Sequence, residues 1–275
     1  MNSRYLRLLA CVLSIIGFQA HAGAQFLSMG TAQSFVVLGG STVTNTGSSV
    51  LMGDLGVSPG SAITGFPPGT VVPPGTIHAA DAVALQAQND VTTSYNVLAG
   101  LAPTQDLTGQ DLGGKTLLPG VYHFSSSAQL TGALTLNALG KSDALFVFQI
   151  GSTLTTASNS SVLIINGGDD CNIFWQVGSS ATVGTTTAFK GNILANTSIT
   201  LNTGATLVDG RTLARNGAVT LDTNMISIAN CPRSPGPAGT FVPAAAPVPE
   251  PGAPALFVGI GLPLFGLVMR RRLRR

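Results

Sequence analysis

Charged side chains are scarce in this sequence: they make up 9% of its 275 residues, and Glu250 is the only glutamate. Hydrolysis of a glycosidic bond needs carboxyl groups on both sides of that bond. The ten aspartates instead stand mostly beside glycine or in turns, as Asp54, Asp111 and Asp209 do, where aspartate usually serves turn hydrogen bonding. The sequence therefore lacks the acid cluster that a β-helix glycosidase or pectinase requires.

Histidine and recognisable catalytic motifs are also nearly absent. Only His78 and His123 follow residue 24, and the sequence has no Gly-x-Ser-x-Gly motif, no phosphate-binding loop and no metal-spaced cysteine and histidine cluster. The adjacent acids Asp169 and Asp170 are compatible with a calcium site that includes backbone carbonyls, but a solvated loop is the simpler interpretation. We therefore predict a protein that is not an enzyme and uses no cofactor or metal.

A basic surface is missing as well. Between residues 25 and 248 the sequence has six basic residues against ten aspartates, although the whole chain has a formal charge of +2. Proteins that bind nucleic acids gather lysine and arginine on one surface. The composition therefore excludes nucleic acid as a partner.

The chain begins with the pattern of an export signal. Arg4 and Arg7 precede the apolar stretch "LLACVLSIIGF" and the small-residue sequence "AHAGA", which are the three parts of a secretory signal peptide. Cleavage after Ala22 or Ala24 fits this pattern, and we place it after Ala24. Residues 1–24 are therefore predicted to be a signal peptide.

The C-terminal end differs in composition from the rest. Residues 232–248 are a linker of proline, alanine and glycine that is unsuited to forming a packed core. Pro249, Glu250 and Pro251 follow, then the apolar stretch 255–269, and then five arginines within the last six residues.

This order of parts resembles the PEP-CTERM sorting signal of Gram-negative bacteria, over residues 249–275. The resemblance implies a transmembrane stretch, a basic end and processing by an exosortase. The 15 apolar residues are fewer than the usual number of about 20 in a spanning helix, and arginines favour the cytoplasmic side. A plain C-terminal membrane anchor is the alternative. Under both interpretations the body is exported and held, at least briefly, at the membrane of the cell envelope.

The body, residues 25–231, is built from repeats. The stretch "FQIGS" at 148–152 matches "WQVGS" at 175–179, and the dipeptide "LA" recurs at an offset of 19 residues. The offset between "FQIGS" and "WQVGS" is longer than 19 residues because the chain between them includes an inserted turn, "IINGGDDC". A period near 19 residues, with short β-rich pieces separated by Gly, Asn and Ser, predicts a β-solenoid whose coils stack to share one core.

One segment, residues 79–99, has helical rather than strand periodicity. Gly100 is a suitable end for this helix, and its apolar stripe consists of Ala84, Ala87, Val91, Tyr95 and Leu98. The strand candidates "FVFQI" and "IFWQV" are apolar at successive positions, so both of their sides must be covered. We therefore expect the helix to lie along one face of the solenoid, with Trp175 packed at the seam between them.

Two cysteines, Cys171 and Cys231, remain after removal of the signal peptide. An exported pair of cysteines is a candidate disulfide. The repeats separate the two by three coils, or about 14 Å at 4.7–4.9 Å for each coil, whereas bonded cysteines have Cα atoms within about 7 Å. The bond forms only if the end of the body runs back along the coils, and the sequence leaves both states open.

Threonine and serine pairs recur at equivalent positions of successive coils. Alternation puts Leu201 and Leu221 inside, so Thr200 and Thr220 face outward. Stacked strands then hold equivalent side chains about 4.7–4.9 Å apart. The candidate surface residues are Thr155, Ser158, Thr182, Thr185, Thr200, Thr203, Thr220 and Thr223.

These rows of threonine have two interpretations. Threonine is favoured in strands, so the rows are compatible with ladders that serve only packing or mark corners. Alternatively, methyl and hydroxyl groups held on a stiff grid order water into an ice-like layer, because the side chain of threonine has restricted χ1 freedom and few charges disturb that water. Asp222 and Lys190, beside the rows, interrupt an otherwise uncharged surface.

Long segments of the body carry a family resemblance. They are "VLGGSTVTNTGSSVLMGDLGVSPGSAITGF", "AADAVALQAQNDVTTSYNVLAG", "DLGGKTLLPGVYHF", "ALFVFQIGSTLTT", "NIFWQVGSSATVGTTTAFKGNILANTSITLNTGATL" and "GRTLARNGAVTLDTN". Over about residues 28–230 the chain resembles the microbial ice-binding protein family. The resemblance implies a mostly β fold, an irregular three-faced β-solenoid with one long α-helix along one face, and adsorption to ice through a flat face. The threonine pairs look like common family framework, which leaves open the face that meets ice.

Two functions follow as hypotheses. The first is an exported ice-binding protein at the cell surface, with the ice crystal as its partner. The second is a non-enzymatic structural or adhesive surface module that binds matrix polysaccharide or neighbouring cells, which the sorting tail would suit.

Overall fold

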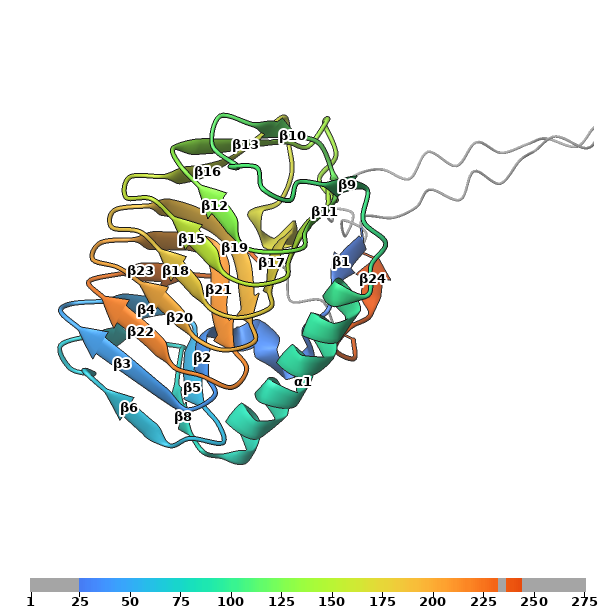
Figure 1. Ribbon diagram of the computed structural model, residues 1–275. Coiled ribbons are helices and arrows are strands. Elements are labelled where there is room, and N and C mark those ends of the chain that lie inside the picture. Colours follow the sequence, from blue (N-terminus) through green and yellow to red (C-terminus); the bar gives the residue numbers. More distant parts are fainter. Residues whose placement is uncertain (1–24, 232–235, 244–275) are drawn as a thin grey trace, which may run out of the picture. The chain divides into compact units, whose positions relative to one another are not determined.

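The computed structural model describes residues 25–231 and 236–243 (Figure 1). The expected signal peptide, the apolar stretch 255–269 and the motif of Pro249, Glu250 and Pro251 lie outside the described residues. Within the described residues, the predicted β-solenoid with one long α-helix is confirmed.

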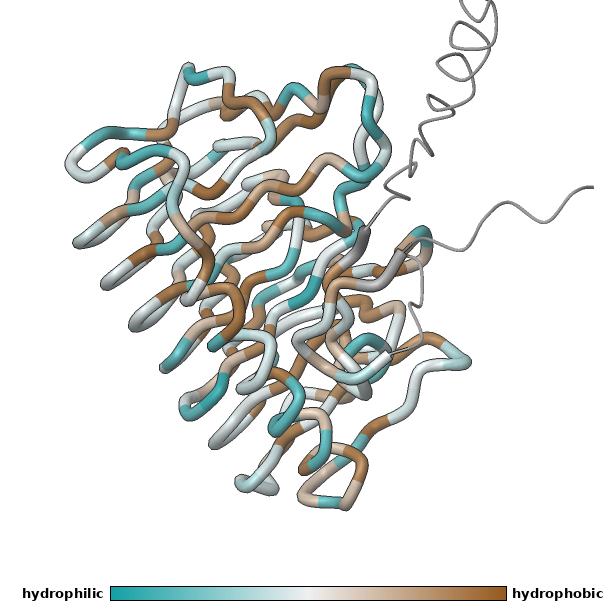
Figure 2. The backbone as a smooth tube through the Cα atoms, turned by 90° about the vertical axis from the view of Figure 1, so that its right-hand side faces the viewer, coloured by the Kyte–Doolittle hydropathy of each residue, from teal (hydrophilic) through white to brown (hydrophobic). Residues whose placement is uncertain are grey.

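Each coil contributes three short strands that pair in parallel with the equivalent strands of the next coil. For example, β14 (Phe146–Ile150) pairs with β17 (Ile173–Val177) along its full length. Parallel stacking at about 4.8 Å aligns equivalent side chains from coil to coil. Figure 2 shows the corners of successive coils following one another at regular intervals, with apolar and polar segments alternating along the chain. The result is three sheet faces around one hydrophobic core.

The first face lies under the helix and is called the helix face. Its strands, in spatial order, are β9 (Gln105–Asp106), β11 (Gly120–Phe124), β14, β17, β19 (Ala188–Ala195), β21 (Thr206–Ala214), β2 (Phe35–Gly39), β5 (Asp54–Val57) and β8 (Ile77–Ala79). Strands β19 and β21 bend around a corner, so each of them also belongs to a second face.

The other two faces are called the threonine face and the aliphatic face. The threonine face consists of β12 (Ala128–Leu130), β15 (Leu154–Thr156), β18 (Ala181–Val183), β20 (Ile199–Leu201), β22 (Val219–Asp222), β3 (Thr42–Thr46) and β6 (Ala62–Thr64). The aliphatic face consists of β10 (Thr116–Leu117), β13 (Ala133–Asn137), β16 (Ser161–Ile165), the first halves of β19 and β21, β23 (Met225–Ser227), β4 (Val50–Met52) and β7 (Thr70–Val71).

The chain does not wind continuously from one end of the solenoid to the other. In chain order, the two N-terminal coils lie at one end of the solenoid, and the helix then takes the chain to the opposite end. The remaining coils return from there until β21, β22 and β23 pair with β2, β3 and β4 (Figure 1). Arg211, which is 2% exposed, helps to join these two parts. Its Nη2 donates to the carbonyl of Gln33 at 2.8 Å, and its Nη1 donates to Oδ1 of Asn192 at 2.7 Å.

The helix α1 (Ala82–Ala99) is held at both ends. Oδ1 of Asp81 accepts a hydrogen bond from the backbone N–H of Ala84 at 2.8 Å, which is an N-cap. At the other end, Nε2 of Gln149 donates to the carbonyls of Leu98 and Leu101, both at 2.8 Å. The predicted stripe is confirmed: the buried residues of the helix include Ala84, Ala87, Val91, Tyr95 and Leu98. The helix begins later than predicted because the preceding residues form β8.

Aromatic rings stack inside the solenoid. The ring of Trp175 lies on that of Phe148, with centroids 3.9 Å apart, and its Nε1 donates to the carbonyl of Lys190 at 3.0 Å. The prediction that Trp175 packs at the helix seam is therefore wrong. Its neighbour Phe174 belongs to the cluster between solenoid and helix, because successive side chains of a strand point to opposite sides.

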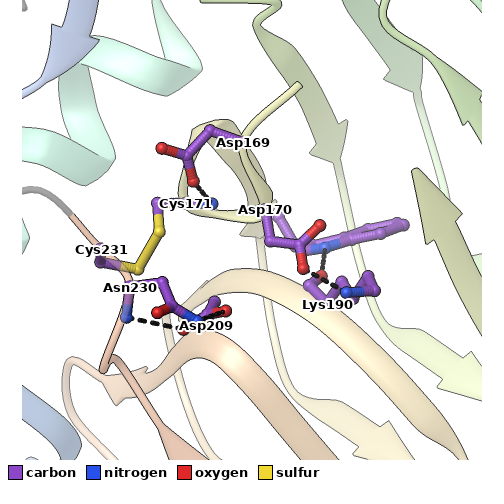
Figure 3. A network of polar contacts seen from close by, with 8 residues as sticks. Asp169, Asp170, Cys171, Lys190, Asp209, Asn230 and Cys231 are labelled. Atoms are coloured by element: carbon purple, nitrogen blue, oxygen red, sulfur yellow. Dashed lines mark hydrogen bonds and ion pairs between the residues drawn. A yellow bond between two sulfur atoms is a disulfide. The ribbon is translucent and has the colours of Figure 1, made fainter. Parts of the chain in front are cut away.

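The two cysteines form a disulfide, with their Cα atoms 5.4 Å apart (Figure 3). Cys171 lies in the short 3-10 helix η2 (Asp170–Asn172), and Cys231 follows β23. The carboxylate of Asp209 accepts hydrogen bonds from the backbone N–H of Asn230 at 3.1 Å and from its Nδ2 at 2.9 Å. The chain after β23 is thus held against the corner beside Cys171, which meets the condition for the bond.

Residues 236–243 also fold against the body, although the sequence predicts a linker over 232–248. Strand β24 (Phe241–Pro243) pairs antiparallel with β1 (Gln25–Leu27). Ser28 donates its N–H to the carbonyl of Thr240 at 2.8 Å. The folded body therefore extends beyond Cys231, and its two described ends lie side by side. The remaining segment, the 3-10 helix η1 (Gly30–Ser34), follows β1.

Candidate functional site

One column of threonines runs across the threonine face. Thr155, Thr182, Thr200 and Thr220 are paired in register from β15 to β22, as the sequence repeats predict. The same column continues through Thr44 of β3 and Thr64 of β6. Six consecutive coils therefore place a threonine at one position, over a length of about 24 Å at 4.8 Å for each step.

The inward neighbours of this column explain its direction and stiffness. Leu201 and Leu221 are buried in the core, as predicted. Since side chains alternate along a strand, Thr200 and Thr220 point away from the core. β-branching restricts the χ1 of each threonine, so the methyl and hydroxyl groups are held in place before any ligand arrives.

The hydroxyls of the column are mostly left unused by the fold. Within the described residues, the one hydrogen bond between two of its side chains joins Thr44 and Thr220, at 3.4 Å. The neighbouring serines are used differently, because Oγ of Ser180 and of Ser198 accept backbone N–H groups of the next coil at 3.3 and 3.2 Å. The threonine column is therefore the part of this face whose polar groups are available to an external partner.

The second members of the predicted pairs do not lie in the column. Ser158, Thr185, Thr203 and Thr223 lie in the turns and bends that follow the strands of the threonine face. Two of them are already engaged, since Thr203 and Thr223 each donate a hydroxyl to the carboxylate of Asp222. The sequence pairs thus consist of one residue on the flat face and one at its corner.

Charge is confined to the edge and one end of the threonine face. Asp222 lies at the corner, whereas Lys190 pairs with Asp170 on the aliphatic side, so the prediction that Lys190 interrupts the threonine rows is wrong. At one end the column passes through Gln129 to Asp111. Burial of Asp111 opposes its ionisation, but hydrogen bonds from Gly113 and Thr131 outweigh this and lower the pKa of Asp111.

The acids around the disulfide form no compact site. Asp169, Asp170 and Asp209 point in different directions and have different partners (Figure 3). Burial, with repulsion from the two other carboxylates, raises the pKa of Asp169. In the part of the chain that the structure describes, no group of three acidic, histidine or cysteine side chains is placed to hold a metal ion.

Sequence reasoning missed the N-terminal part of the column. Thr44 stands in "TVTNT", whose alternation of threonine with inward residues is the same as in β22. This signal was visible, but the spacing of the N-terminal coils is too irregular to align them with the repeats. Their position next to the last coil depends on contacts between residues 176 positions apart.

Comparison with known proteins agrees with this architecture. Residues 37–227 match the Ice-binding-like family. The chain is 56% identical to an ice-binding protein of Nostoc sp. (strain HG1), over 100% of this chain and 98% of that protein. It is 35% identical to an ice-binding protein of Colwellia sp., over 75% of this chain and 85% of that protein.

Solved structures show the same fold. An ice-binding protein from an Antarctic biological consortium is 50% identical with a TM-score of 0.70, over 73% of this chain and 90% of that one. An ice-binding protein from the Antarctic ascomycete Antarctomyces psychrotrophicus is 41% identical with a TM-score of 0.71, over 74% and 99%. The family match over most of the solenoid, together with a relative this similar along its whole length, places the chain in the ice-binding-like family.

Proposed function

We propose that this protein binds ice through the threonine face. The observation that carries the proposal is the column of six in-register threonines, whose hydroxyls are mostly free and whose carboxylate neighbours stand only at the edge or end. The relatives are named ice-binding proteins, one of them from an Antarctic biological consortium, and these names support the same function.

The physical basis is preorganisation. A flat grid fixed by the fold loses little conformational entropy when it adsorbs to a crystal, because the cost of ordering was met in folding. Threonine offers a methyl group beside a hydroxyl, so the grid holds ordered water without drawing it into the hydration shell of a charge. Ice that grows between adsorbed molecules must curve, which opposes further growth. No step of this action requires catalysis or a cofactor.

Ice shaping by the solenoid alone tests this proposal. We expect a protein of residues 25–243 to facet single ice crystals, to separate their freezing and melting temperatures and to slow recrystallisation at micromolar concentration. Circular dichroism with a β-rich spectrum is the control for folding. Well-folded protein that leaves ice crystals round and freely growing would exclude the function.

We also propose that the chain is exported by residues 1–24 and processed at a PEP-CTERM tail of residues 249–275, with an exosortase and the membrane as partners. The order of Pro-Glu-Pro, apolar stretch and arginines supports this. Within residues 25–231 and 236–243, the structure has no helix long and apolar enough to cross a membrane. Mass spectrometry of the mature protein from a host with an exosortase should find Gln25 as the first residue and a chain that ends near Pro249.

The same tail favours a second candidate function, adhesion at the cell envelope. This alternative predicts that residues 25–243 bind matrix polysaccharide or cells at growth temperature and have no effect on ice. Pull-down with extracellular polysaccharide at 25 °C, compared with the ice assay on one protein preparation, separates the two functions.

A further inference from the structure

The aliphatic face differs in chemistry from the threonine face that it adjoins. Its strands expose large apolar side chains: Met52, Leu163, Ile165 and Met225 are each 40–44% exposed. They form two patches, one on β16 and one on β4 and β23. Between the patches lie β19 and β21, which present the smaller residues Ala188, Thr206 and Val208 and also Lys190. Exposed apolar patches that are rimmed by polar residues often mark an interaction site.

The aliphatic face is almost free of charge. Among its described strands Lys190 is the one charged side chain that is not buried, and its ammonium pairs with the carboxylate of Asp170. Asp209 lies in β21 at the corner, but it is 7% exposed and its carboxylate is bound by Asn230. A strongly charged partner would find nothing to recognise here. Two copies of the face, in contrast, could meet without bringing unpaired like charges together.

We infer that the aliphatic face binds the aliphatic face of a second copy of this chain, around a two-fold axis that lies in the interface, runs parallel to the strands and passes near Val208. Strand β21 has β16 two strands away on one side and β4 two strands away on the other. Rotation about this axis therefore lays Leu163 of one copy against Met52 of its partner, and the reverse. The two apolar patches are matched to each other by symmetry, and the small residues of β21 meet at the centre.

The size of the face predicts a weak dimer. Eight strands at about 4.8 Å and a width of about three to five residues at 3.3 Å cover roughly 350–550 Å² in projection, and side-chain relief adds to this. Two such faces come to about the lower limit of specific interfaces, near 1,200 Å² in total. A lipid surface fits less well, because the strands of the face carry neither tryptophan nor a cluster of basic residues.

This pairing places the two threonine faces outside the contact, so the dimer has two of them. A bivalent molecule binds a surface more tightly than one site allows wherever both sites engage it. The inference itself does not rest on ice binding, because self-association is measured without ice.

Sedimentation equilibrium of residues 25–243 tests the dimer. We expect a monomer–dimer equilibrium with a dissociation constant of about 10–100 µM. Leu163→Asp and Met52→Asp should each raise that constant at least about tenfold, because each buries a carboxylate without a partner. Leu85→Asp is the matched control, since Leu85 is also an exposed leucine, 52% exposed, but lies on the helix; it should leave the constant unchanged.

Three results would overturn the inference. They are a monomer at all concentrations up to about 1 mM, a dimer that Leu163→Asp leaves intact, and a dimer that Leu85→Asp weakens as much. A dimer of residues 25–243 that is lost in residues 25–275 would also overturn it, because the chain's own tail would then occupy the face. If a variant that stays monomeric still shapes ice, the proposed function holds even where the dimer does not.

Discussion

Replacement of Thr200 by tyrosine should remove most ice activity while leaving the fold intact. Thr200 stands inside the threonine column, paired with Thr182 on one side and Thr220 on the other. A tyrosine ring there projects beyond the neighbouring methyl and hydroxyl groups and holds the flat face away from the crystal. Because central contacts dominate surface recognition, we expect freezing hysteresis at equal concentration to fall to about a tenth or less of the unmodified value.

Controls separate this effect from a general loss of stability. Asn96→Tyr adds the same ring on the exposed side of α1 and should preserve activity. Thr203→Ala removes a hydroxyl that is already bound to Asp222 at the corner and should reduce activity only slightly. Thermal unfolding monitored by circular dichroism should change little in all three variants. Full activity of folded Thr200→Tyr would assign the ice contact to another face.

Thr44→Tyr extends the same experiment to the N-terminal coil. Its column position is adjacent to Thr220, although 176 residues separate the two along the chain. If the whole column meets ice, this variant should lose activity to a similar degree as Thr200→Tyr. If Thr200→Tyr loses ice activity and Thr44→Tyr keeps it, the ice contact is limited to the coils that the sequence repeats identify.

The solenoid was predictable because its signals are local and periodic. A 19-residue offset, alternation around Leu201 and Leu221, and a helical stripe ending at Leu98 each specify one element without reference to the rest of the chain. The threonine column from Thr155 to Thr220 followed directly, because stacking in register is a consequence of the repeat.

Features that depend on distant contacts were not predictable. Strand β17 reads "IFWQV" and is buried at every position, so alternation could not decide which side Trp175 takes, and a shift of one residue exchanges the two sides. Thr44 and Thr64 belong to the column because α1 takes the chain to the opposite end of the solenoid. The later coils then return, and the last of them packs against the N-terminal coils. Coil-by-coil alignment contains no information about that closure.

The disulfide is a similar case, and it leads to the second large prediction. The distance of three coils between Cys171 and Cys231 is bridged because Asp209 binds Asn230 and holds the returning chain at the corner. The bond closes a loop with a sequence separation of 60 residues. In the chain-entropy model, a loop of this length corresponds to about 4 kcal/mol of stabilisation, and measured values are commonly 2–4 kcal/mol.

Cys171→Ser should therefore lower the free energy of unfolding of residues 25–243 by about 2–4 kcal/mol. For a chain of this size that corresponds to a decrease in melting temperature of about 5–15 °C. Urea and thermal unfolding, with and without reductant, measure both quantities. Cys231→Ser should match Cys171→Ser, and the double variant should lose no more than either, since all three remove one bond. Reductant should lower the stability of the unmodified protein and leave the variants unchanged.

Ice activity distinguishes this structural role from a functional one. The disulfide lies at a corner between the aliphatic and helix faces, beside Asp209 in β21 (Figure 3). Within the described residues, no recorded contact joins it to a side chain of the threonine column. Near 0 °C, where Cys171→Ser is expected to stay folded, its ice shaping should equal that of the unmodified protein. Loss of ice shaping by folded Cys171→Ser would show that the corner supports the flatness of the threonine face across the core. Unchanged unfolding after reduction would instead show that the hydrogen bonds of Asp209 and Arg211 suffice to hold the C-terminal part in place.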